Sequence, residues 1–231
     1  MKTIKEKQII PRSFIFFFGL LIMALGIVLI LKANLGATPW DVLHVGLFYQ
    51  LGLTIGSWSI IVGFVILGVT ALLTKKPPQV GAFLNMLTVG IFIDMYLLLP
   101  FIQTPNYLLG KGIMFLFGLV IMCYGMGLYI SANLGAGPRD SLMLALTNRT
   151  GWKVRNIRVG MEIMVLIIGW ILGGPVSIGT FLLSLLIGPI FGYAMPQCTA
   201  FSNYLLEKLK PTVKMEMLET ENTKIKRGVS S

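Results

Sequence analysis

The sequence predicts an all-α integral membrane protein with six transmembrane helices, arranged as two inverted three-helix repeats. Three observations lead to this prediction: long apolar runs, an asymmetric distribution of basic residues, and an internal repeat. Of the 231 residues, 55% are hydrophobic and only 12% are charged. An ordinary globular domain carries about 25% charge. Together with a mean hydropathy of +0.83, this composition excludes a soluble enzyme and a secreted disulfide scaffold.

Six apolar runs are candidates for spans, since a bilayer core takes about 20 residues per helix. The expected spans are 13–31, 58–74, 80–99, 112–131, 159–172 with its flanks, and 177–194. They divide the chain into a basic cytoplasmic N-terminus (1–12), a first membrane repeat (13–100), an outer loop (101–111), a second membrane repeat (112–204) and a polar cytoplasmic tail (205–231). The first span is read as an uncleaved helix, because five more spans follow it.

The basic residues predict the orientation of these spans. With the N-terminus inside, 17 of the 19 Lys and Arg residues lie on the cytoplasmic side, and only Lys32 and Lys111 lie outside. Such a distribution follows the positive-inside rule, so both termini are expected in the cytoplasm. The formal net charge of +10 is therefore interpreted as an orientation signal, and no nucleic-acid partner is expected.

An internal repeat covers almost the whole membrane region. When the chain is shifted by 99 residues, 14–47 lies over 113–146 with 17 identities in 34 positions. A one-residue slip then aligns 80–84 with 178–182. Each copy carries three spans, and an odd number makes the second copy enter from the opposite side. Inverted copies of this kind are a recurring transporter plan; the alternative is an old duplication kept only as scaffold.

The best-matched segment of each copy lies between its first and second spans, at 33–44 and at 132–140. Each segment predicts a helix break followed by a new helix start. Gly and Asn leave helical geometry easily, which favours the break. Thr38 and Gly137 suit an N-cap, Pro suits the first helical position, and Asp complements the helix dipole. The new helices run only about a dozen residues, which is too short to cross. We expect a re-entrant or interfacial half-helix on the outer face in the first copy and on the inner face in the second.

Discontinuous helices at matching positions of two inverted halves point to a transporter binding site. Free N–H groups at such a helix start bind anions, and freed carbonyls bind cations. The candidate substrate-binding residues are Asn34, Gly36, Pro39, Asp41, His44, Asn133, Gly135, Pro138, Arg139 and Asp140. The alternative is a flat interfacial helix whose Asp only caps its own N-terminus. His44 follows Asp41 by three residues, which predicts a shared helix face, either for pH-sensitive binding or as a structural pair.

Ionisable residues within spans are costly and therefore point to function. Asp94 is the candidate for ion or proton coupling, or else a partly hydrated acid near the interface. Its counterpart in the second copy is Gly192. Glu162 follows Arg158 by four residues, the spacing of a helix ion pair. Glycines that recur every seven residues predict close helix packing; they are Gly19, Gly26, Gly118 and Gly125.

Enzymatic activity is not expected. The sequence contains no Walker loop, no Ser/His/Asp order and no HExxH motif. One histidine and two cysteines without CxxC spacing predict neither a metal site nor a cofactor. Cys123 and Cys198 are expected to be reduced and structural.

The run Asn-Leu-Gly-Ala-Thr-Pro-Trp-Asp-Val-Leu-His, repeated with Gly-Pro-Arg-Asp at its second turn, resembles the YczE/YitT family of bacterial multi-pass membrane proteins, and more narrowly its YczE branch. The resemblance covers 13–196. It implies a bacterial cell membrane and a multi-pass topology, and it supplies neither a substrate nor catalytic residues. Arg139 stands where the first copy has Trp40, which indicates that the two sites are not equivalent.

The favoured function is a small-solute permease or transporter-like protein whose two half-helix starts face a central cavity. Its expected partners are the lipid bilayer and a small solute. The alternative is a non-transporting accessory or regulatory protein that supports another membrane or biosynthetic complex. In that case, the basic inner loop and the tail are the expected contacts with a protein partner.

Overall fold

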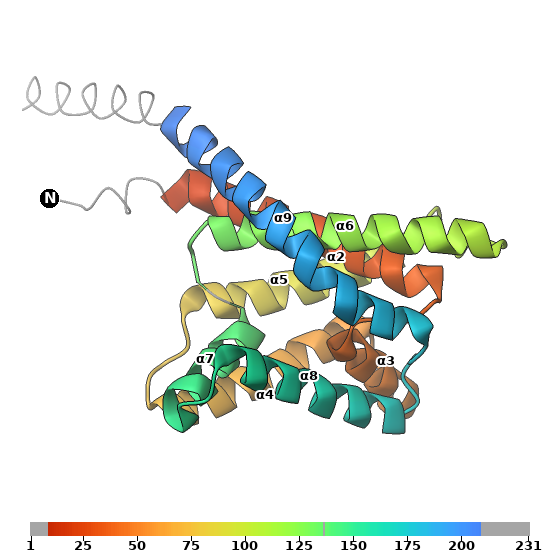
Figure 1. Ribbon diagram of the computed structural model, residues 1–231, viewed down its shortest axis with the longest axis horizontal. Helices are drawn as coiled ribbons and strands as arrows, with labels where there is room; N and C mark the ends of the chain where they lie inside the picture. Colours follow the sequence, from red (N-terminus) through yellow and green to blue (C-terminus); the bar gives the residue numbers. More distant parts are fainter. Residues whose placement is uncertain (1–8, 136, 209–231) are drawn as a thin grey trace, which may run out of the picture.

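The computed structural model describes residues 9–135 and 137–208, which form eight α-helices and, in these ranges, no strand (Figure 1). The expected all-helical architecture is confirmed. The helices are α2 (Ile9–Ala33), α3 (Pro39–Leu51), α4 (Ile55–Thr74), α5 (Val80–Leu97), α6 (Leu108–Ser131), α7 (Pro138–Thr150), α8 (Val154–Ile171) and α9 (Ile178–Lys208). Part of the expected N-terminal segment and most of the expected tail lie outside the described residues.

Five helices are long and apolar enough to cross a membrane, namely α2, α4, α5, α6 and α9. They cover five of the six expected spans, and α9 continues for 31 residues to Lys208 instead of ending at 194. The remaining expected span corresponds to α8, which has 18 residues but carries Arg155, Arg158 and Glu162. Its charges, rather than its length, distinguish α8 from the other five.

The two copies of the repeat have the same local structure. The half-helices α3 and α7 each contain 13 residues and begin and end at positions 99 residues apart. Before them, Asn34 and Asn133 both adopt a positive φ, of 53° and 56°. Two residues later, Gly36 and Gly135 have φ values of 128° and 137°. The expected helix breaks are therefore present in both copies, with the same backbone path.

The centre of the fold is the antiparallel pair α2 and α6, which lie side by side (Figure 1). Gly19 and Gly26 of α2 lie against the backbone of α6, and Gly118 and Gly125 lie against α2. A Cβ added at Gly19 would meet the Tyr129 backbone nitrogen at 2.5 Å, which real side chains do not tolerate. The predicted close packing at the seven-residue glycine spacing is confirmed.

Each half-helix packs mainly on the other copy of the repeat. Helix α3 lies against α8, and α7 lies against α4. Each helix break likewise contacts a helix of the other copy. Gly179 at the start of α9 donates a hydrogen bond to the Leu35 carbonyl (3.0 Å), and Gly81 at the start of α5 lies against the Leu134 carbonyl. These reciprocal contacts fix the two half-helix starts between the two copies.

Candidate substrate-binding cavity

The start of α3 is built by its N-cap, as its sequence predicts. Thr38 adopts an extended conformation and accepts a hydrogen bond from the backbone N–H of Asp41 (3.3 Å). Its hydroxyl also donates to Asp41 Oδ2 at 2.5 Å. Pro39 occupies the first helical position, where no N–H is needed. The equivalent cap of α7 is Gly137, which provides no side-chain hydrogen bond.

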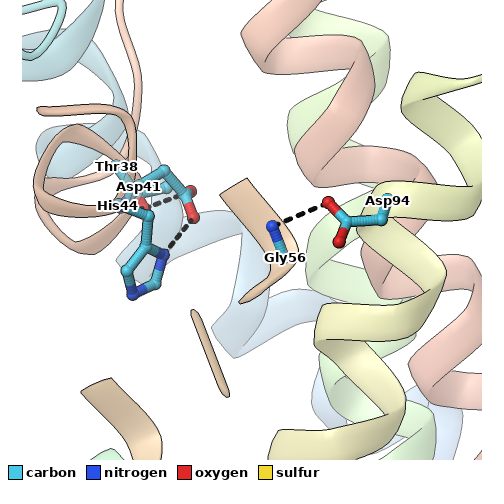
Figure 2. Close-up of polar contacts among 5 residues, drawn as sticks. All are labelled: Thr38, Asp41, His44, Gly56 and Asp94. Atoms are coloured by element: carbon cyan, nitrogen blue, oxygen red, sulfur yellow. Dashed lines mark hydrogen bonds and ion pairs between the residues drawn. The ribbon is translucent and has the colours of Figure 1, made fainter. Parts of the chain in front are cut away.

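Asp41 and His44 lie on the same face of α3, as their spacing predicts (Figure 2). Both side chains are buried, and the His44 Nδ1 to Asp41 Oδ1 distance is 3.8 Å, longer than a hydrogen bond. The polar neighbours of the Asp41 carboxyl group are thus the Thr38 hydroxyl, which donates to it, and the His44 ring. Asp41 is therefore a buried acidic side chain with polar partners from its own helix.

The starts of the two half-helices meet. The Arg139 guanidinium of α7 lies over the Trp40 ring of α3, with 4.6 Å between the guanidinium carbon and the ring centroid. This is a cation–π contact, which attracts a cation to the negative face of the ring. Trp40 and Arg139 are equivalent positions of the two copies, so their contact lies where the copies approach each other. The sequence showed the difference between these residues without showing that they touch.

A cavity of about 800 Å³ lies between the two copies, and side chains from all eight described helices line it. Six of the predicted site residues are in its wall: Pro39, Asp41, His44, Pro138, Arg139 and Asp140. The other four predicted residues belong to the breaks and do not line it. Asn34 and Asn133 are exposed at the turns, while Gly36 packs on Thr180 and Gly135 approaches Gly81.

Asn85 of α5 is a polar group in the cavity wall whose side-chain nitrogen has no hydrogen-bond partner among the described residues. Asn85 is 7% exposed, and its Oδ1 lies beside Gly137, at the start of α7. An unpaired buried donor is costly, because its hydrogen bond to water is lost without replacement. The amide is therefore positioned to donate to a ligand in the cavity.

Methionine side chains form much of the apolar wall. Six of the thirteen methionines of the chain line the cavity: Met23, Met86, Met122, Met126, Met143 and Met161. Methionine is flexible and polarisable, so it adapts to ligands of irregular shape. Sequence reasoning missed this wall, although Met23 and Met122 are identical positions of the repeat and supplied a signal.

Asp94, the predicted coupling residue, is not among the residues that line the cavity. Its Oδ1 accepts a hydrogen bond from the Gly56 backbone N–H (2.8 Å), and its Oδ2 accepts one from the Thr54 hydroxyl (2.5 Å). Figure 2 shows the Asp94 carboxylate beside Gly56, apart from the Asp41 and His44 cluster. Asp94 thus caps the start of α4 from the neighbouring helix, and its role in coupling stays a prediction.

The predicted ion pair on α8 is present, with Arg158 Nε 3.2 Å from Glu162 Oε1. Both residues line the cavity, as does Arg155. They lie at i, i+3 and i+7, which places them on one face of the helix. The charges that set α8 apart from the other spans therefore face the cavity.

A comparison with protein-family models matches residues 10–196 to a family of unknown function, DUF6198. The chain is 43% identical to the uncharacterised membrane protein YczE of Bacillus subtilis, over 90% of this chain and 97% of that protein. It is 33% identical to the uncharacterised protein YyaS of the same organism, over 77% of this chain and 89% of the relative. An uncharacterised protein of Haemophilus influenzae is 34% identical over 76% of this chain and 79% of its own length. No solved structure matches the chain.

Proposed function

The chain belongs to the multi-pass membrane protein family DUF6198, and from this premise we propose that it is a small-solute permease or transporter-like protein. Its substrate site is the cavity between the two copies of the repeat. Its principal binding groups are the half-helix starts, with Asp41, His44, Arg139 and Asp140.

One observation carries this proposal: the starts of two equivalent half-helices meet at the wall of one cavity. The distribution of basic residues predicts that the two breaks lie at opposite faces of the membrane. Each half-helix is about 20 Å long, and the bilayer core is about 30 Å thick. Half-helices that enter from opposite faces and touch at their starts must both reach into the core. With that orientation, the contact supports the re-entrant arrangement over the interfacial one.

The electrostatics at this point suit substrate binding. Residues of both helix starts line the cavity, and a helix start carries the positive end of the helix dipole. Asp41 and Arg139 carry opposite formal charges, belong to opposite half-helices and line the same cavity. A ligand between the half-helix starts can therefore contact groups of both copies.

A thermal-stability screen of the detergent-purified protein against ions and metabolites tests the proposal. A ligand present at about 100 times its dissociation constant should stabilise the parent protein by about 2.7 kcal/mol. The matched variant is Asp41→Asn with Asp140→Asn, which removes two carboxylates from the cavity and preserves the shape of both side chains. We expect the shift in the parent protein and its loss in the variant.

An equal shift in both proteins would place the ligand outside the half-helix starts. A broad panel without any shift would count against a permease and favour the accessory role. In that case, truncation after Leu209 should abolish the cellular phenotype, whereas substitutions in the half-helices should act only through folding.

A further inference from the structure

The two copies differ in how their last two helices pack. In the first copy, Gly56 and Gly63 of α4 allow α5 to approach closely. A Cβ added at Gly90 of α5 would lie 2.6 Å from the Gly56 carbonyl, and one added at Gly63 would fall against Met86. Helices α4 and α5 are therefore in direct contact along this glycine seam.

In the second copy, this seam is absent. The positions equivalent to Gly56 and Gly63 are Arg155 and Glu162, whose long side chains prevent such an approach. On α9, a Cβ added at Gly188 or Gly192 would meet nothing within 4 Å. Figure 1 shows α8 and α9 diverging from the loop that joins them. The cavity-lining residues that are exposed all belong to these two helices, so the cavity opens sideways between α8 and α9.

Two side-chain donors of the cavity wall have no acceptor among the described residues. Asn85 has an unpaired side-chain nitrogen, and Arg155 makes no hydrogen bond or ion pair within the described ranges. The carboxylates of Asp41 and Glu162 already have partners in Thr38 and Arg158. Donors without matching acceptors favour an anionic group on the ligand.

The apolar part of the cavity sets the second requirement. The methionine wall is joined by apolar side chains from α5 and α9, among them Val89, Ile187 and Phe191. A small inorganic anion would leave this wall without a partner, whereas an alkyl chain would cover it. Helix α9 is long and apolar enough to cross a membrane, and only 22% of its most apolar window is buried, so its exposed apolar residues are available to lipid beside the opening.

We propose that the ligand is an amphiphile with an anionic head and a single alkyl chain, and that it enters the cavity from the bilayer between α8 and α9. This inference rests on the proposed function and names the substrate class of the same cavity. The head is held by Asn85 and Arg155, and the chain lies along the methionine wall.

Fluorescence quenching of Trp40 tests this proposal directly. Trp40 is 8% exposed and lines the cavity, so a lipid outside the protein does not reach its ring. Replacing the other three tryptophans by Phe leaves Trp40 as the sole emitter; they are Trp58, Trp152 and Trp170. A lysophosphatidylglycerol with a brominated chain should then quench Trp40 saturably. The unbrominated lipid should compete, whereas lysophosphatidylcholine and glycerol 3-phosphate should compete poorly.

A matched pair of variants tests the entrance. Gly188→Phe fills the opening, and Gly68→Phe adds the same ring to an exposed face of α4 that does not line the cavity. Neither new Cβ meets a neighbour, so both variants should fold. We expect Gly188→Phe to raise the half-saturating lipid concentration by about tenfold or more and Gly68→Phe to change it by less than about twofold. Arg155→Gln should reduce the preference for the anionic lipid over lysophosphatidylcholine.

Three results would overturn the amphiphile proposal. The first is no saturable quenching of Trp40, and the second is equal quenching in the Gly188→Phe and Gly68→Phe proteins. The third is stabilisation by glycerol 3-phosphate alone, without lipid quenching, which would identify a soluble anion as the ligand. The third result leaves the permease proposal standing, whereas a ligand screen without any shift removes the permease proposal itself.

Discussion

Asp41 and Asp94 show how two carboxylates near helix starts take different places in the structure. Asp41 lies in the first turn of α3 and faces the cavity, where the Thr38 hydroxyl donates to it. Asp94 lies near the end of α5 and caps α4, another helix. Both positions are consistent with the rule that acids stabilise helix starts. From the sequence, both are acids in apolar surroundings, and only the tertiary structure separates a cavity residue from a cap.

The cap formed by Asp94 predicts a loss of stability on substitution. Asp94→Ala leaves the Gly56 N–H and the Thr54 hydroxyl without their acceptor, so it should lower the free energy of unfolding by about 1–3 kcal/mol. Asp94→Asn keeps one oxygen and should lose less. Denaturant titration in detergent measures both variants. If Asp94→Asn instead abolished transport at unchanged stability, Asp94 would act in coupling and not as a cap.

At the scale of elements, the half-helices are the part that could be predicted from sequence. Break, cap, proline and acid are local signals that predicted both helix starts, and the expected length of about a dozen residues agrees with the 13 residues of α3 and α7. The surroundings of these helices could not be predicted in this way. That α3 packs on α8 and α7 on α4 depends on contacts between residues far apart in the chain. The unpaired state of the Asn85 amide likewise depends on what surrounds it.

The glycine contact between α2 and α6 gives a prediction for a pair of helices. Gly26→Ala places a methyl group against the Met122 backbone and should cost about 1–3 kcal/mol through overpacking. The control is Gly68→Ala on α4, where the methyl group meets nothing and alanine improves helix propensity by up to about 1 kcal/mol. Thermal unfolding of the two purified variants compares them. Equal melting temperatures would contradict the close approach of α2 and α6.

For the whole molecule, the predicted orientation can be tested by single-cysteine labelling. Cysteines at Thr104 and Ser177 should react with an impermeant reagent from outside, and those at Lys76 and Asn148 should react only after the membrane is opened. All four positions are exposed, while the native Cys123 and Cys198 are buried, so the background should be low. Labelling of position 76 from outside would contradict the inverted arrangement.

The internal repeat allowed the arrangement of the whole chain to be predicted from the sequence, but only for the features that the two copies share. The 99-residue shift predicted that the two copies match, and their backbones do match at the breaks. The structural effect of residues that differ between the copies was harder to predict. Arg155 and Glu162 occupy the positions of the second copy that are equivalent to Gly56 and Gly63. Their effect on the contact between α8 and α9 can be inferred only once the glycine seam of the first copy is known.

The contact between Trp40 and Arg139 has a consequence for why the two copies share one chain. Trp40 and Arg139 occupy equivalent positions of the two copies. If the two copies were separate, identical subunits of a dimer, the same residue would occupy both positions and would contact its own counterpart. Two arginines in that place would repel, and two tryptophans would offer no cation. Joining the copies covalently frees each position to change alone, so that one supplies the charge and the other the ring. A symmetric homodimer with either residue at both positions is therefore expected to assemble less stably than the single chain.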